Sequence, residues 1–301
     1  MNKTRRSWQR VDGVLLLNKP SGMTSNSALQ SARRQFSAAK AGHTGTLDPL
    51  ASGLLPLCFG EATKFSADLL EADKTYEAEL LFGVTTDTGD AEGVVLQQRP
   101  IEFGRCDLEA ALTRFRGRIS QVPPMYSALK RNGTPLYQLA RQGIEVERKA
   151  REVTIDELRL LDFSGNACRL HVSCSKGTYI RTLAEDIGNA LTCGAHLTAL
   201  RRVAIGPLSI SDAVTLDQLS LLSEDDRASW LLAPDTLLQS LPDVHLDDEA
   251  ALRFSHGNPV NIAGNIKVAQ GKCRVYGATR LLGLGEADGL GGVKPRRLVC
   301  A

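Results

Sequence analysis

The chain has no long hydrophobic segment and no clustered cysteines. Its 301 residues contain no apolar stretch long enough to cross a bilayer, and the apolar run at 14–17 is too short for the core of a signal peptide. The seven cysteines are odd in number and include no Cys-x-x-Cys pair, which argues against a disulfide framework and against a zinc site. The five histidines include no His-x-x-x-His pair. We therefore expect a cytoplasmic protein that binds no metal and does not associate with membranes.

Several motifs of cofactor chemistry are also missing. The sequence has no Gly-x-x-x-x-Gly-Lys-Ser/Thr phosphate loop, and Gly283 and Gly285 lack the third glycine of a dinucleotide-binding fingerprint. It has no Gly-x-Ser-x-Gly elbow, the motif that carries the nucleophile of many serine hydrolases. A cofactor-dependent metabolic enzyme and a serine hydrolase are therefore disfavoured, and we expect no cofactor.

The charges are distributed unevenly although the net charge is only +2. Residues 1–50 carry eight Lys and Arg against two acids, residues 114–151 carry nine against two, and residues 252–301 carry eight against two. The blocks 51–113 and 203–251 are strongly acidic. If folding brings the basic blocks together, a polyanion could lie across them. A solvated pattern without any partner explains the charges equally well.

Apolar periodicity predicts a mixture of strands and helices without a strict βαβ rhythm. Strands are predicted at 14–17, 74–85, 167–175 and 197–205, and helices from Thr24 or Ser25 to Phe36, at 108–115 and at 179–191. The fold class is therefore α+β with a largely antiparallel sheet. The acidic, leucine-rich stretch 212–240 predicts surface helices. From residue 241 the chain turns into short glycine-rich strands, so the domains predicted are 1–240 and 241–301.

Two polar, turn-rich segments contain the candidate catalytic side chains. In the segment 41–53, Pro49 biases Asp48 towards an extended conformation that can hold its carboxylate out from a loop. An Asx turn, in which Asp48 bonds its own backbone, is an equally good reading. In the segment 175–181, Arg181 lies at a helix start, where its fork of donors suits a carboxylate or a phosphate. A core tyrosine and a solvated arginine are the alternatives there.

Seven segments of the chain, in order from residue 13 to about 207, resemble the tRNA pseudouridine-55 synthases of the bacterial TruB type. They are 13–25, 42–53, 74–76, 86–90, 124–130, 175–181 and 194–202, and 295–299 extends the likeness towards the C-terminus. The resemblance implies a pseudouridine synthase fold, in which a mixed sheet is flanked by helices and followed by a small PUA-like β domain that binds RNA. It also implies that uridine 55 in the T loop of tRNA is isomerised to pseudouridine. We expect a monomer.

The resemblance also implies roles for individual residues. Asp48 corresponds to the essential aspartate of the family, and Arg181 to an arginine paired with it. Tyr179 corresponds to a tyrosine of the pocket, with both catalytic and substrate-binding roles. Tyr76 corresponds to a tyrosine that stacks on the target uracil.

Two further substrate contacts are implied. Leu200 corresponds to a leucine that touches the substrate. His43 corresponds to a histidine that helps to displace nucleotides of the T loop.

The implied reaction breaks the C1′–N1 bond, turns the uracil and closes a C1′–C5 bond, with neither redox chemistry nor an external energy source. The base must first be flipped out of the stack. Asp48 could attack C1′ as a nucleophile or remove a ribose proton to give a glycal, and the sequence is compatible with both routes.

Two other functions remain compatible with the scaffold. One is a non-catalytic protein that binds or folds RNA, and the other is a synthase that acts on a different RNA, such as rRNA. The presence of Asp48, Tyr76 and Arg181 together favours an active enzyme. The basic blocks would contact the phosphate backbone, so binding should weaken as salt is added.

Overall fold

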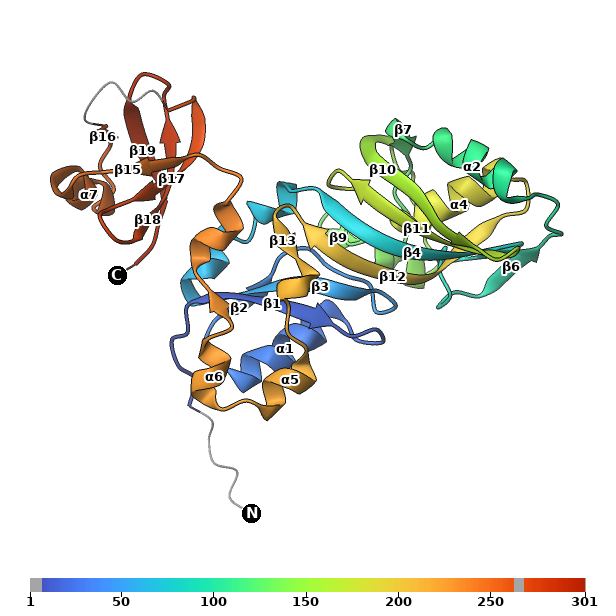
Figure 1. Ribbon diagram of the computed structural model, residues 1–301, viewed down its shortest axis with the longest axis horizontal. Helices are drawn as coiled ribbons and strands as arrows, with labels where there is room; N and C mark the ends of the chain where they lie inside the picture. The colour runs from blue at the N-terminus through green and yellow to red at the C-terminus, as the bar shows by residue number, and fades with distance from the viewer. Residues whose placement is uncertain (1–6, 263–267, 301) are drawn as a thin grey trace, which may run out of the picture.

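A large mixed sheet forms the body of the molecule in the computed structural model, which describes residues 7–262 and 268–300 (Figure 1). Its strand order is β14-β1-β3-β12-β4-β11-β10-β7. These strands are β1 (Gly13–Lys19), β3 (Ser52–Phe59), β4 (Lys74–Phe82), β7 (Gly117–Gln121), β10 (Arg151–Phe163), β11 (Ala167–Cys174), β12 (Ala195–Ile205) and β14 (Leu231–Leu232). The strand β2 (Ala41–His43) pairs with β3, and β13 (Leu208–Ser209) pairs with β12. The contact of β3 with β12 is parallel and the other described pairs of this sheet are antiparallel, which confirms the predicted sheet type.

Short helices surround the sheet, except the last of them, which packs against the C-terminal strands. The α-helices are α1 (Ser25–Gln35), α2 (Arg105–Thr113), α3 (Leu136–Arg141), α4 (Ile180–Ala190), α5 (Leu216–Leu221), α6 (Glu224–Ala228) and α7 (Asp248–Ser255). The 3₁₀ helices are η1 (Gly60–Phe65), η2 (Leu69–Glu71), η3 (Ile210–Asp212) and η4 (Pro234–Leu238). Thr24 caps α1, because its side chain accepts a hydrogen bond from the backbone N–H of Ser27 at 3.1 Å.

Strands β1 and β3 are buried on both faces, which explains their nearly continuous apolar sequences. One face packs against α1 through Leu15, Leu17, Leu55, Leu57 and Phe59. The other face packs against η1 and η4 through Val14, Leu16, Leu54 and Cys58. This half of the sheet is therefore the middle layer of a three-layer arrangement.

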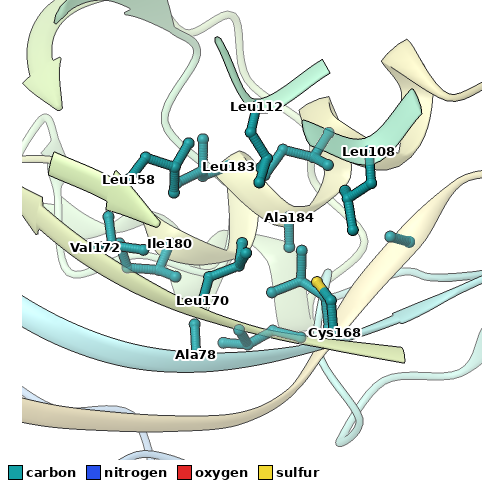
Figure 2. Packing of buried hydrophobic residues seen from close by; sticks show 14 of the residues in the cluster. Ala78, Leu108, Leu112, Leu158, Cys168, Leu170, Val172, Ile180, Leu183 and Ala184 are labelled. Atoms are coloured by element: carbon teal, nitrogen blue, oxygen red, sulfur yellow. The ribbon is translucent and has the colours of Figure 1, made fainter. Parts of the chain in front are cut away.

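Strands β4 and β11 follow the alternating pattern that the sequence predicts, with one face buried. The buried side chains are Ala78, Leu80, Phe82, Cys168, Leu170, Val172 and Cys174. Helices α2 and α4 cover this face, and Figure 2 shows Leu183 and Ala184 of α4 lying between Leu112 of α2 and Leu170 of the sheet. The predicted strand 74–85 is interrupted at Gly83, which has a φ of +81°.

Two apolar clusters lie on this side of the sheet. The α1 cluster contains Leu15, Leu29 and Leu57, and the α4 cluster contains Leu80, Leu170 and Leu183. The clusters meet at two side chains. Tyr76 of β4 and Leu200 of β12 pack against both the α1 cluster and the α4 cluster. The first turn of α4 starts beside this seam. The seam is where the candidate catalytic residues gather.

A second sheet follows residue 241 and has its own core (Figure 1). Its order is β15-β17-β18-β19-β16, with β15 (Asp243–His245), β16 (Val260–Asn261), β17 (Gly271–Tyr276), β18 (Leu281–Ala287) and β19 (Gly292–Leu298). It lies at the end of the molecule opposite α2 and touches the body through Leu284, which packs into the η1 and η4 cluster. The predicted change to short strands is confirmed, but α7 was not predicted.

The prediction of surface helices for 212–240 is wrong in part. The short helices α5 and α6 do lie there, with α6 wholly unburied. Leu231 and Leu232, however, form the edge strand β14, and η4 buries Leu237 and Leu238 against the sheet. Leu237 and Leu238 thus cover the second face of β1, a burial that the local sequence does not reveal.

Two small hairpins complete the fold. One pairs β5 (Val84–Thr86) with β6 (Val95–Gln98), and the other pairs β8 (Lys130–Arg131) with β9 (Thr134–Pro135). Among the described residues, none of the helices has the length and apolar character needed to span a membrane.

Candidate active site

The loop between β2 and β3 carries Asp48 between two anchoring leucines. Leu47 is buried in the α1 cluster, and Leu50 packs against the α4 cluster. Ser25, the first residue of α1, fixes Leu47 further: its hydroxyl donates to the carbonyl oxygen of Leu47 at 2.9 Å and accepts from its N–H at 2.8 Å. Asp48 is therefore held at the seam between the two clusters.

Asp48 forms an ion pair with Arg181. The distance between Arg181 Nη2 and Asp48 Oδ2 is 3.0 Å. The Arg181 side chain is 7% exposed and that of Asp48 is 45% exposed, so the carboxylate can meet a ligand while the guanidinium supports it from inside. The Asx-turn alternative is not what the structure shows, because the carboxylate faces Arg181.

Arg181 makes three further contacts. It donates from Nη1 to the carbonyl oxygen of Thr88 at 3.0 Å and from Nη2 to that of Tyr126 at 2.7 Å. Its Nε lies 3.6 Å from Oδ2 of Asp90, which is 4% exposed. A buried guanidinium with its donors satisfied in this way is fixed in orientation.

The sequence interpretation assigned no role to Asp90. Its Oδ1 accepts from Thr88 Oγ1 at 2.6 Å and from the N–H of Glu92 at 3.1 Å, which leaves Oδ2 free to face Arg181. The signal was present, since the segment 86–90 carries part of the family resemblance, but nothing local shows that the loop reaches α4.

Tyr179 is the N-cap residue of α4 and lies two residues before Arg181. It is half-buried, and burial raises the pKa of its phenol, so the hydroxyl is protonated at neutral pH. The side chain of Gln121, at the end of β7, hydrogen-bonds both backbone polar groups of Tyr179. Gln121 had no predicted role either.

Tyr76 and Leu200 lie on neighbouring strands at the seam. Burial raises the pKa of the Tyr76 phenol, and the charge of Arg202 acts in the opposite direction. Arg202 is the cross-strand partner of Tyr76 in the β4–β12 pair. An aromatic face and an aliphatic side chain are therefore presented close to one another beside the Asp48 loop.

Arg202 is a second buried cation that the sequence interpretation missed. It is 2% exposed, and it donates from Nε to the carbonyl oxygen of Leu54 at 2.8 Å and from Nη2 to that of Gly45 at 3.3 Å. Because Gly45 lies in the Asp48 loop, Arg202 ties this loop to the centre of the sheet.

His43 lies on β2 and is not joined to Asp48 by any hydrogen bond or ion pair of the described residues. Burial lowers the pKa of its imidazole, and the charge of Arg202 lowers it further, so His43 is neutral at pH 7. Its buried Nδ1 has no partner within 7–262 and 268–300. The structure thus places this predicted residue on the Arg202 side of the site.

Lys19 closes the turn at 20–23, which contacts the Asp48 loop because the N–H of Gly22 donates to the carbonyl oxygen of Pro49 at 2.8 Å. It is fully buried and donates from Nζ to the carbonyl oxygens of Pro20 at 2.8 Å and Met23 at 2.6 Å. Burial lowers its pKa to about 8, while the negative charge of Asp48 acts in the opposite direction. Lys19 is therefore a further buried basic group whose charge interacts with Asp48.

Metal-binding side chains do not cluster here. The part of the chain that the structure describes contains no group of three His, Cys, Asp or Glu that could hold a metal ion. None of the seven cysteines forms a disulfide. What the arrangement offers is a supported carboxylate, an aromatic face and protonated phenols.

The surface cavity of about 440 Å³ in the C-terminal sheet does not belong to this site. Its charged lining residues are Asp247, Glu249, Arg253, Glu286, Asp288 and Lys294. Four acids against two basic side chains make it unsuited to a phosphate backbone.

Three family descriptions match almost the whole chain. The N-terminal domain of the TruB family pseudouridylate synthases matches residues 33–180, the C-terminal domain of tRNA pseudouridylate synthase B matches 181–241, and the C-terminal region of pseudouridine synthase II TruB matches 242–299. These matches confirm the resemblance on which the sequence interpretation relied.

Individual proteins are similar over nearly their full length. A tRNA pseudouridine synthase B of Dechloromonas aromatica is 61% identical over 98% of this chain and 98% of its own. One of Chromobacterium violaceum is 55% identical over 99% of this chain and 98% of its own.

Solved structures share the fold. A chain of a Cbf5-Nop10-Gar1 complex is 26% identical, with a TM-score of 0.74 over 95% of this chain and 84% of that chain. A chain of an H/ACA RNP bound to a substrate RNA is 23% identical, with a TM-score of 0.74 over 99% of this chain and 92% of that chain. The predicted pseudouridine synthase fold is thereby confirmed.

Proposed function

The chain belongs to the TruB family of pseudouridylate synthases, and on that premise we propose that it converts uridine 55 in the T loop of tRNA into pseudouridine. The observation that carries the proposal is the 3.0 Å ion pair between Asp48 and Arg181 at the seam of the two apolar clusters. A carboxylate that is open to a ligand on one side and supported by a buried cation on the other suits chemistry at C1′.

The target base must reach this carboxylate from inside the tRNA fold. Flipping it out of the stack costs a few kcal/mol, and stacking on the ring of Tyr76 would return roughly 1–3 kcal/mol. Leu200, which packs beside Tyr76, would fill the opposite side of the base pocket. The same two side chains would retain the uracil after the C1′–N1 bond breaks.

Asp48 would act on the glycosidic bond by one of two routes. Either its carboxylate attacks C1′ as a nucleophile, or it removes a ribose proton to give a glycal. Arg181 favours the ionised carboxylate in both routes because it places a cation 3.0 Å away. Tyr179, which is protonated, can donate a hydrogen bond to the base or to the ribose.

His43 would take part in displacing nucleotides of the T loop. It is neutral and only half-buried, so its ring can stack on a displaced base. This role agrees with its position away from the Asp48 carboxylate.

The tRNA would be held by basic surface on either side of the site. The stretch 122–150 bears exposed basic side chains, among them Lys130, Arg131 and Lys149, and it reaches the site through the carbonyl of Tyr126. The chain beyond residue 240 would form the PUA-like RNA-binding domain, with a catalytic domain at 1–240. We further propose that the enzyme works as a monomer in the cytoplasm, without a cofactor.

The direct test compares wild type with Asp48→Asn on an unmodified tRNA transcript, with pseudouridine mapped at single-nucleotide resolution. We expect wild type to modify the T-loop uridine and Asp48→Asn to bind the tRNA without modifying it. If wild type binds tRNA but forms no pseudouridine, the protein is an RNA-binding or RNA-folding protein. If it modifies rRNA instead, the proposed substrate is wrong.

A further inference from the structure

The basic stretch 122–150 is an excursion from the sheet that leaves and returns at one point. Gln121, the last residue of β7, pairs with Arg151, the first residue of β10. The 29 residues between them contain α3 and the β8–β9 hairpin, and about half of them are exposed. The excursion is therefore joined to the sheet at a single base, formed by this pair.

Gln121 is buried at that base, and its amide engages one residue of the active site. The side chain is 2% exposed. Its Nε2 donates to the carbonyl oxygen of Tyr179 at 3.3 Å, and its Oε1 accepts from the N–H of Tyr179 at 3.1 Å. The amide thus forms a two-bond pair with an extended residue, much as a neighbouring β-strand would.

This pair fixes the start of α4. Tyr179 is the N-cap, its backbone is extended (φ −104°, ψ 111°), and no side-chain cap bond holds the helix start. Without Gln121, the backbone N–H of Tyr179 would lose its partner, and its carbonyl oxygen would keep only the N–H of Leu183 at 3.0 Å. Tyr179 and Arg181 would then be free to shift together, since they lie within the same turn.

The excursion also contacts Arg181 directly. The carbonyl oxygen of Tyr126, five residues after Gln121, accepts from Arg181 Nη2 at 2.7 Å, and the same nitrogen faces Asp48. The first part of the excursion therefore touches the catalytic ion pair from two directions, through the Gln121 amide and through the Tyr126 carbonyl.

We propose that Gln121 is a positioning residue that couples the RNA-binding excursion to the catalytic ion pair by clamping the backbone of Tyr179. The proposal rests on the proposed function. In it, Gln121 does not touch the substrate; it sets the register of Tyr179 and Arg181 relative to Asp48.

The test is Gln121→Met in the full-length protein, a change that keeps the side-chain volume and removes both hydrogen bonds. The single-turnover rate constant is measured with enzyme in excess over an unmodified tRNA transcript. The Kd is measured in an Asp48→Asn background, where binding is not followed by turnover. We expect the rate constant to fall about a hundredfold, since a displacement of about 1 Å is enough for such a loss, while the Kd stays the same.

Three further variants distinguish a loss of Tyr179 positioning from a general loss of protein stability. Gln98→Met makes the same chemical change at an exposed site outside the excursion and should react like wild type. Ile119→Ala weakens β7 itself without touching the clamp and should lower the melting temperature more than the rate. Gln121→Asn keeps a buried amide but shortens its reach, so it should fold even if Gln121→Met does not, and should still react slowly.

The outcomes distinguish the two proposals. Wild-type rates in Gln121→Met or in Gln121→Asn would overturn the clamp, and so would a loss confined to Kd or an equal loss of rate in Ile119→Ala. Failure of wild type to form pseudouridine would overturn the proposed function instead.

Discussion

Arg181 serves four acceptors at once, and this explains why the position needs a guanidinium. Its three nitrogens reach Asp48, Asp90 and the carbonyl oxygens of Thr88 and Tyr126. An ammonium group carries the same charge, but it is compact and cannot reach acceptors that lie in such different directions. The position therefore demands the shape of arginine as much as its charge.

We predict that Arg181→Lys will lower the single-turnover rate on tRNA about 10- to 100-fold with little change in affinity, because the carboxylate of Asp48 loses its fixed partner. Arg181→Ala should in addition lower the free energy of unfolding by about 3–5 kcal/mol, because Asp90 stays buried without a cation. Single-turnover kinetics and urea unfolding measure the two effects.

Arg159→Lys, at a side chain that is 56% exposed, is the control for this exchange and should leave rate and stability unchanged. An Arg181→Lys protein that reacts at the wild-type rate but binds tRNA poorly would show that Arg181 contacts the RNA rather than orienting Asp48.

The parallel contact between β3 and β12 joins the two halves of the large sheet. Only the pairs Ser52 with Arg201 and Gly53 with Arg202 form it. Gly53 has a φ of +102°, and a Cβ atom there would lie 2.3 Å from the carbonyl oxygen of Arg202. The strands approach so closely that only glycine fits.

Gly53→Ala should therefore lower the free energy of unfolding by about 3 kcal/mol or more, through backbone strain and the clash together. Because Arg202 also holds Gly45, we expect catalysis to suffer as well. Gly165→Ala is the matched control, since Gly165 has a φ of +79° but nothing within 4 Å of the added methyl group, and it should cost only about 1 kcal/mol. Equal losses in the two variants would show that the close approach to Arg202 has no energetic weight.

Elements whose burial is set by their own pattern were predictable from the sequence. The alternation in β4 and β11 and the apolar run of β1 gave correct strands, and α1 starts at its predicted cap. The segment η4 was mistaken for surface because its leucines are buried by the opposite face of β1, more than 200 residues earlier in the chain.

Contacts between residues distant in the chain also limited the prediction of the site. The pairing of Asp48 with Arg181 was expected from the family resemblance, not from the residues themselves. The buried polar side chains of Gln121 and Arg202 act through contacts with distant backbone groups, and Asp90 acts through the distant side chain of Arg181. A glutamine at the end of a strand looks like any exposed amide until the fold brings Tyr179 against it.

At the scale of the whole molecule, buried thiols are spread over separate parts of the core. Cys58 lies in the cluster beneath η1 and η4, and Cys168 and Cys174 lie in the α4 cluster. Burial raises the pKa of each of these thiols to about 12. Burial is the largest cause of the raised pKa at all three thiols, so the shifts persist as long as the clusters stay packed.

The shifts couple the stability of the whole chain to alkaline pH. The pKa of each thiol is higher in the folded chain than in the unfolded chain, so the unfolded chain loses the thiol proton first as pH rises. The contribution of the buried thiol to the free energy of unfolding is therefore complete below pH 9 and is lost as pH rises from 9 towards 12. Between pH 8 and pH 10 each thiol should remove about 1.4 kcal/mol from the free energy of unfolding. Lys19 acts in the opposite direction, because its lowered pKa of about 8 makes its burial less costly as pH rises.

Because the thiols and Lys19 have opposite effects, the pH dependence of the wild-type free energy of unfolding does not isolate the thiols. The difference in this free energy between wild type and a cysteine variant does. We predict that wild type and Cys58→Ala, unfolded in urea under reducing conditions, will differ by about 1.4 kcal/mol less at pH 10 than at pH 8, because only wild type loses the Cys58 term. Cys106→Ala removes an exposed thiol, and its difference from wild type should stay constant. A constant difference for Cys58→Ala as well would mean that water reaches Cys58 in the folded state. The cluster beneath η1 and η4, which also receives Leu284 from the C-terminal sheet, would then open without global unfolding.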